Sequence, residues 1–192
     1  MPQEKEQNPT SSSLSFYVRS YENFWPADAC VRLIERFETS SDKKIQQADG
    51  SFSFTQVDVS KTWPELHDEI ARKLSVVFYR YQTELGVRQF WPARYFYENM
   101  RIKRYLPNGR DEFPPHVDVY NSASAARFMA VLLYLNEPEG GQTVFQNLGL
   151  SIAPQTGKLL IFPPHWTFPH AGLPPIASNK YILTTYLLYP PP

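Results

Sequence analysis

Residues 128–162 read FMAVLLYLNEPEGGQTVFQNLGLSIAPQTGKLLIF. Three short apolar runs, at 128–135, 142–145 and 158–162, are separated there by segments that contain Pro, Gly and Asn. Short apolar or β-branched runs bounded by such residues are typical of β-strands. A fourth run at 180–189 and a loosely alternating, aromatic-rich stretch at 94–105 have the same character. Several short strands without helices between them predict a sandwich or a jelly roll, the double-stranded β-helix.

The chain before this β-rich part is predicted to be helical. In the segment 26–38, apolar residues recur at the spacing of one helix face, and Pro26 stands where a helix can begin. In a second, longer helix, Thr62 and Glu65 form a capping box, and Gly86 ends the helix. The expected apolar face of this helix consists of Leu66, Ile70, Leu74, Val77, Phe78, Tyr81 and Leu85. The predicted fold class is mostly β, with N-terminal helices that flank a jelly-roll core.

The length of 192 residues fits one domain of ordinary size. Residues 1–13 are polar and are expected to be disordered, which leaves 14–192 as a single domain. Helical support is expected over about 14–90 and the jelly-roll core over about 91–192. Residues 39–50 are polar and end in Asp49-Gly50, which is a turn signal.

Charge and cysteine content argue against several classes of function. Lys plus Arg and Asp plus Glu both number 19, so a net charge of zero gives no support to a nucleic-acid or membrane partner. The single cysteine, Cys30, excludes an internal disulfide and a thiolate cluster, and we expect it to be a buried core thiol. The N-terminus lacks an apolar signal core, and no apolar run approaches the about 20 residues of a membrane helix. We therefore expect a cytoplasmic protein.

Two of the residues that could bind a metal lie close together in the sequence. His116 and Asp118 are two positions apart, and on a β-strand such residues point to the same side of the sheet. This pair needs one more nitrogen ligand, which His165 or His170 could supply from a later segment. Two histidines and one carboxylate on one side of an octahedron favour a non-haem iron(II) oxygenase. His67 has no second histidine four residues on, so a zinc-protease helix is excluded and an exposed helix histidine is expected.

A lysine opens the last predicted strand. By alternation, Lys180, Ile182, Thr184 and Tyr186 share one side of that strand. A lysine that points into a β-core is costly unless its charge is paired. A dicarboxylate co-substrate would pair it, and the alternative is a lysine at the strand end in solvent.

Several motifs occur in a fixed order between Arg104 and Tyr189. They are RYLPNG (104–109), HVD (116–118), Arg127 with LYLN (133–136), GGQTVF (140–145), Pro154 with Gly157, FP (162–163), HAGLPP (170–175) and KY (180–181). In order and spacing this segment resembles the prolyl 4-hydroxylase-like branch of the 2-oxoglutarate- and Fe(II)-dependent dioxygenases. Residues 21–25, YENFW, resemble more weakly the N-terminal entry of that family.

The resemblance implies a metal site and a co-substrate anchor. His116, Asp118 and His170 correspond to the iron ligands of the family. The ten-residue step from His170 to Lys180 is the usual spacing in the family and decides against His165. Lys180 corresponds to the basic residue that binds the far carboxylate of 2-oxoglutarate.

The resemblance extends to residues around the co-substrate. Tyr134 corresponds to a tyrosine that hydrogen-bonds the same carboxylate, and Tyr105 to a pocket tyrosine near the metal. Thr184 is expected to face inward near Lys180 and to add a hydroxyl. Arg127 corresponds to a recurrent arginine that either faces the substrate or forms a structural ion pair. Gly140-Gly141 lacks the helix and lysine of a phosphate loop, so we expect a hairpin turn.

The resemblance also implies a reaction. Fe(II), 2-oxoglutarate and O2 would be required, with ascorbate as an accessory reductant. The enzyme would hydroxylate an unactivated C–H bond of a prolyl or other amino-acid substrate, in a peptide or free, and release succinate and CO2. A non-catalytic jelly-roll binding module and a metal hydrolase with the same three ligands are the alternatives. The segment 39–60 and the loop 106–115 are expected to face the substrate.

Overall fold

The computed structural model describes residues 14–48 and 52–191. Three α-helices and three 3-10 helices lie within these residues: η1 (Leu14–Tyr17), α1 (Ala27–Thr39), α2 (Val59–Thr62), α3 (Pro64–Leu85), η2 (Arg88–Phe90) and η3 (Gln146–Leu148). The strands are β1 (Arg19–Tyr21), β2 (Lys44–Ala48), β3 (Phe52–Asp58), β4 (Phe96–Tyr97), β5 (Arg101–Tyr105), β6 (Phe113–His116), β7 (Arg127–Tyr134), β8 (Thr143–Phe145), β9 (Leu150–Ile152), β10 (Leu159–Phe162), β11 (His170–Gly172) and β12 (Lys180–Leu188).

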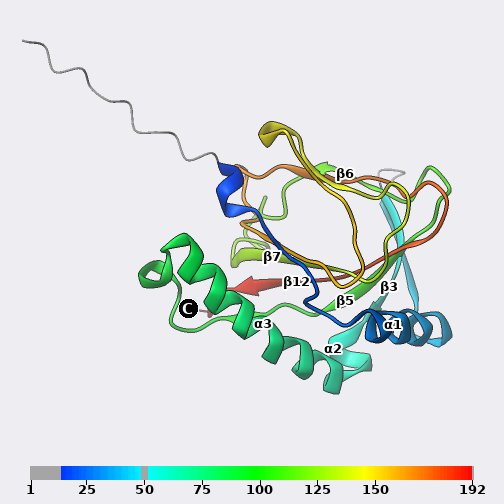
Figure 1. Ribbon diagram of the computed structural model, residues 1–192, viewed down its shortest axis with the longest axis horizontal. Helices are drawn as coiled ribbons and strands as arrows, with labels where there is room; N and C mark the ends of the chain where they lie inside the picture. Colours follow the sequence, from blue (N-terminus) through cyan, green and yellow to red (C-terminus); the bar gives the residue numbers. More distant parts are fainter. Residues whose placement is uncertain (1–13, 49–51, 192) are drawn as a thin grey trace, which may run out of the picture.

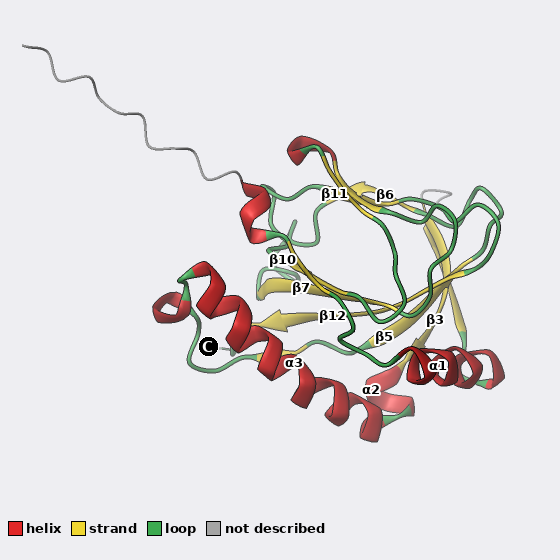
Figure 2. Ribbon diagram, viewed as in Figure 1, coloured by secondary structure: helices red, strands yellow, loops and turns green. Residues whose placement is uncertain are grey.

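The strands form two antiparallel sheets that face each other (Figure 2). The larger sheet has 8 strands in the order β1-β10-β7-β12-β5-β3-β2, with β4 paired to β12. The smaller sheet has 4 strands in the order β6-β11-β8-β9. This arrangement confirms the predicted jelly roll, and the last strand of the chain, β12, lies in the middle of the larger sheet.

Helices cover the outer face of the larger sheet, on the side away from β6 (Figure 1). Alternation along β12 divides its side chains between the two faces. Tyr181, Leu183 and Leu187 join the core cluster that includes α1 and α3, whereas Ile182 joins the cluster between the sheets. Even-numbered residues at the start of β12 therefore face the space between the sheets, where the candidate site lies.

The predicted helices are present, but the start of the longer one differs from the prediction. Trp63 is the N-cap of α3, no side chain caps it, and Pro64 is the first helical residue. Thr62 instead belongs to the short helix α2, which the Asp58 side chain caps by accepting from the N–H of Lys61. The capping box was therefore a wrong prediction, because Pro64, which has no N–H and a fixed φ, begins the helix itself. Gly86 ends α3 as predicted, in the left-handed conformation with φ 67°.

Much of the polar segment 39–60 is strand and not loop. Its described residues include the paired strands β2 and β3, and β3 pairs in turn with β5 and so extends the larger sheet. The predicted turn at Asp49-Gly50 and the predicted disorder of 1–13 lie outside the described residues. In the described part of the chain, no helix has the length and apolar character required to cross a membrane.

Candidate metal centre and co-substrate cavity

Two histidines and one aspartate converge between the ends of two neighbouring strands. His116 ends β6 and His170 begins β11, and the antiparallel pairing of these strands sets the two residues opposite each other. Asp118 joins them, so that one ligand atom from each residue lies within 4.8 Å of the others. Oδ1 of Asp118 is 3.4 Å from Nε2 of His116, and Oδ2 is 3.6 Å from Nε2 of His170. This triad offers two nitrogens and a carboxylate to one point.

The route by which Asp118 reaches this point differs from the predicted one. Strand β6 ends at His116, and Asp118 lies two residues beyond it in a bend. The N–H of Asp118 donates to the carbonyl of Pro164 at 3.2 Å instead of to a strand partner. Asp118 and His116 therefore converge as predicted, but strand alternation is not the reason, because Asp118 lies outside the strand.

Hydrogen bonds to backbone carbonyls orient both imidazoles. Nδ1 of His116 lies 2.8 Å from the carbonyl oxygen of Pro114, and Nδ1 of His170 lies 3.1 Å from that of Phe168. A carbonyl accepts only, so each Nδ1 carries the proton and each Nε2 keeps its lone pair for a metal. Burial lowers the pKa of His170 to about 4, which keeps this ring neutral at pH 7.

Asp118 is buried, yet it remains a carboxylate. Burial alone would raise its pKa, but the adjacent imidazoles of His116 and His170 and the Tyr186 hydroxyl together hold the pKa below its ordinary value. A carboxylate beside the Nε2 atoms of two imidazoles is a donor set that suits iron(II). The triad therefore fits a mononuclear iron centre.

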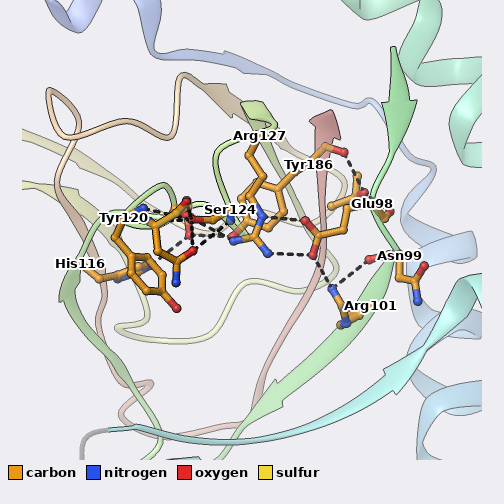
Figure 3. A network of polar contacts seen from close by, with 11 residues as sticks. Glu98, Asn99, Arg101, His116, Tyr120, Ser124, Arg127 and Tyr186 are labelled. Atoms are coloured by element: carbon orange, nitrogen blue, oxygen red, sulfur yellow. Dashed lines mark hydrogen bonds and ion pairs between the residues drawn. The ribbon is translucent and has the colours of Figure 1, made fainter. Parts of the chain in front are cut away.

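Asp118 is held by a network of polar contacts, of which Figure 3 shows Glu98, Arg127 and Tyr186. The Tyr186 hydroxyl donates to Oδ1 of Asp118 at 2.6 Å, and the Arg127 guanidinium lies over the Tyr186 ring at 4.2 Å. Arg127 also donates to the backbone carbonyl of Asp118 at 3.0 Å and binds both carboxylate oxygens of Glu98, at 2.6 and 2.9 Å. Of the two interpretations of Arg127, the structure shows the ion pair.

Removal of the Tyr186 hydroxyl should weaken metal binding. In Tyr186→Phe, Asp118 loses a short hydrogen bond, and loss of such an outer-shell partner lowers metal affinity by roughly 10- to 100-fold. Titration of the protein with Fe(II) under anaerobic conditions measures this directly. Tyr189→Phe is the matched control, because Tyr189 is 48% exposed at the end of the same strand. Equal affinities for the two variants would contradict the role given to Tyr186.

One cavity contains the triad and the predicted face of β12. Lys180, Ile182, Thr184 and Tyr186 all line it, together with Tyr105 of β5. Lys180 is 2% exposed, which rules out a lysine in solvent at the strand end. Among the described residues, no carboxylate lies within ion-pair distance of its ammonium, and burial, with a smaller effect of Lys103, lowers its pKa to about 7. A buried, unpaired ammonium in a cavity fits an anionic ligand.

Gly141 makes room for this lysine. Its φ is +72°, and a Cβ at this position would lie 3.0 Å from Cδ of Lys180. Both the backbone conformation and the close approach therefore require glycine. Gly140 forms an isolated antiparallel bridge with Pro175 just before β8, and the glycines form no phosphate loop. The predicted hairpin turn was wrong, because the flanking strands β7 and β8 belong to different sheets and do not pair.

Tyr134 and Tyr105 take different positions. Tyr105 lines the cavity, and the Lys180 ammonium lies 5.4 Å from the centre of its ring. Tyr134 is fully buried behind the cavity wall, and its hydroxyl lies 2.7 Å from Oγ1 of Thr143. Thr143 itself lines the cavity. On this side the cavity is therefore lined by Thr143, with the Tyr134 hydroxyl as its hydrogen-bond partner.

Three residues of this site were not predicted from the sequence: Thr143, Tyr186 in its contact with Asp118, and Lys103. Alternation along the segment 142–145 was the only available signal for Thr143. The other two histidines lie elsewhere. His165 lines a groove with Trp91 and Phe128, and His67 on α3 contacts Asp68 at 2.9 Å.

A jelly roll that brings two imidazoles and a carboxylate to one point has the donor set of a mononuclear non-haem iron site. Residues 100–188 match the model of the 2OG-Fe(II) oxygenase superfamily. Enzymes of this superfamily use Fe(II), 2-oxoglutarate and O2. The triad and Lys180 fit the first two of these.

Solved structures with the same fold include three prolyl hydroxylases. A viral collagen prolyl hydroxylase from Paramecium Bursaria Chlorella virus-1, in complex with 2OG, is 19% identical, with 91% of this chain and 97% of that chain covered and a TM-score of 0.65. A Trichoplax adhaerens prolyl hydroxylase in complex with a hypoxia inducible factor peptide fragment is 17% identical, with 91% and 84% covered and a TM-score of 0.67. A Pseudomonas putida prolyl-4-hydroxylase is 17% identical, with 91% and 94% covered and a TM-score of 0.61. No curated protein matches the sequence.

Proposed function

We propose that this protein is a 2-oxoglutarate- and Fe(II)-dependent dioxygenase that hydroxylates a C–H bond of a prolyl or other amino-acid substrate. The observation that carries this proposal is the buried, unpaired Lys180, which lines the same cavity as the triad. The fold shared with prolyl hydroxylases, one of them in complex with 2OG and one with a peptide, supports the choice of co-substrate and substrate class.

In this proposal, His116, Asp118 and His170 hold the iron, and Lys180 pairs with the far carboxylate of 2-oxoglutarate. Hydroxyls of Thr143 and Thr184 line the same cavity and provide hydrogen-bond partners for that carboxylate. When bound, the iron and 2-oxoglutarate supply the oxidising chemistry, with succinate and CO2 as co-products.

The residues of the chain bind and orient the iron and 2-oxoglutarate, and they exclude water from the cavity. Tyr105 closes the cavity beside Lys180, and Ile182 and Leu132 give it apolar walls. Tyr186 holds one carboxylate oxygen of Asp118, and backbone carbonyls orient the imidazoles of His116 and His170 toward the same point. A fixed ligand set and a partly apolar cavity limit side reactions during oxygen chemistry.

Two measurements test the proposal. Calorimetric titration should show that the protein binds 2-oxoglutarate only after it has been loaded with a divalent metal. Incubation with Fe(II), 2-oxoglutarate, ascorbate and O2 should then release succinate, and prolyl compounds should increase the rate. Metal binding without 2-oxoglutarate binding would instead support a metal hydrolase, which has no use for Lys180. Absence of both would support a non-catalytic binding module.

A further inference from the structure

A second cavity lysine, Lys103, has so far been given only an effect on the pKa of Lys180. It lies in the middle of β5, opposite Ile182 of β12 on one side and Gln56 of β3 on the other. Its side chain lines the cavity of the triad and also an outer cleft that extends over β3 to Gln46 of β2. Cavity and cleft share the residues Lys103, Phe113, His116, Asp118, Thr184 and Tyr186. Lys103 therefore stands where a substrate in the cleft would approach the metal.

The other charged groups that line the outer cleft have partners. Arg127 and Arg101 both bind Glu98, with shortest distances of 2.6 and 3.4 Å. Asp118 lies 3.4 Å from His116 and belongs to the triad. For Lys103, no described carboxylate lies within ion-pair distance, and Arg127 is held by Glu98. Lys103 is therefore the cation of the cleft that remains available to a ligand.

Two aromatic rings hold the Lys103 ammonium in place. Its Nζ lies 4.7 Å from the centre of the Phe54 ring and 5.6 Å from that of Phe113. Cation–π contacts of this kind attract an ammonium but do not neutralise its charge. Burial lowers the pKa of Lys103 to about 8, against the opposing effect of Asp118, so the side chain is cationic at neutral pH.

The formal charges in the loaded site leave Lys103 without a counter-charge. A divalent iron and Lys180 together carry three positive charges, and Asp118 with dianionic 2-oxoglutarate carries three negative ones. Both carboxylates of 2-oxoglutarate are then engaged, one at the metal and one at Lys180. An uncompensated ammonium in a partly buried cavity is unfavourable, and a further carboxylate would pair with it.

We propose that Lys103 binds a carboxylate of the organic substrate, carried on or next to the residue that is hydroxylated. This inference rests on the proposed function and narrows its substrate class. The carboxylate comes either from the C-terminus of a free amino acid or short peptide, or from an acidic side chain beside the target residue. In either case, the neutral amide of the same compound should be a poor substrate.

Matched pairs of probes test this proposal. L-Proline is compared with L-prolinamide for the terminal carboxylate, and acetyl-Glu-Pro-amide with acetyl-Gln-Pro-amide for the acidic side chain. Each probe is titrated by calorimetry, without O2, into protein loaded with Fe(II) and 2-oxoglutarate, and substrate-stimulated succinate release is measured with O2. At least one carboxylate should bind about 10-fold or more tightly than its amide, because a charge-assisted hydrogen bond contributes roughly 1.5–3 kcal/mol.

Variants of Lys103 identify the group responsible. Lys103→Met should abolish the preference for the carboxylate and leave the Kd of 2-oxoglutarate within about twofold, whereas Lys103→Arg should retain part of the preference. Lys61→Met is the control, because the Lys61 side chain is 75% exposed on α2.

Three outcomes would overturn the proposal. They are equal binding of acid and amide in both pairs, a preference that persists in Lys103→Met, and a loss of 2-oxoglutarate affinity in that variant. Loading with Fe(II) and 2-oxoglutarate is measured first. If the protein does not bind Fe(II) and 2-oxoglutarate, the proposed function itself is refuted. If it binds both but does not distinguish the acid from the amide, only the role of Lys103 is refuted.

Discussion

His170→Ala is expected to lose Fe(II) binding and succinate release together. His170 is one of the two nitrogen ligands in the triad, and Ala171 and Gly172, which follow it, offer no substitute donor. Loss of an outer-shell partner already costs up to about 100-fold in affinity or activity, so removal of a ligand should exceed that. Anaerobic Fe(II) titration and a succinate assay measure the two effects independently.

His165→Ala is the matched control for this experiment. His165 lies five positions earlier, and its side chain lines a groove with Trp91 and Phe128 instead of the metal cavity. This variant should bind Fe(II) as the unmodified protein does. If His165→Ala loses the metal and His170→Ala keeps it, the ligand set proposed here is wrong.

The β-core was predictable because its signals are local. Short apolar runs bounded by Pro, Gly and Asn correspond to β7, β8, β10 and β12, and alternation along β12 placed Lys180 and Thr184 in the cavity. The β2–β3 hairpin was missed because its residues are mostly polar. Its inner residues Gln46 and Gln56 line a cleft, and Gln56 interrupts the alternation of apolar and polar residues that begins at Phe52.

Contacts that depend on the pairing of distant strands could not be predicted. Tyr186 and Asp118 are 68 residues apart in the sequence, and only the return of β12 to the middle of the sheet brings them together. Lys103 likewise faces the cavity because β5 pairs with β12 in one register, in which Lys103 lies opposite Ile182. A shift of one residue would direct it to the helices. His170 was placed beside His116 and Asp118 because the resemblance, not the residue spacing alone, proposed it as the third ligand.

Lys180→Met is expected to weaken 2-oxoglutarate binding by roughly 10- to 100-fold, because a hydrogen bond to a charged group contributes about 1.5–3 kcal/mol. Methionine retains most of the volume of the side chain beside Gly141, so the packing of the cavity is preserved. The maximal rate at saturating 2-oxoglutarate should fall much less, since Lys180 does not belong to the triad. Calorimetry with metal-loaded protein gives the Kd, and the 2-oxoglutarate dependence of succinate release separates KM from kcat.

The pH dependence of the same Kd distinguishes a charge effect from a packing effect. Burial lowers the pKa of Lys180 to about 7 in the free protein. The ammonium is therefore present below pH 7 and is lost above it, so 2-oxoglutarate should bind progressively more weakly as the pH rises from 7 to 9. Lys180→Met should lack this part of the dependence, and Lys61→Met should retain it.

Lys180→Met should also raise the Tm of the ligand-free protein, because a lysine pKa below its unfolded value destabilises the fold at neutral pH. A variant with unchanged Kd, pH profile and Tm would show that Lys180 is not the anchor.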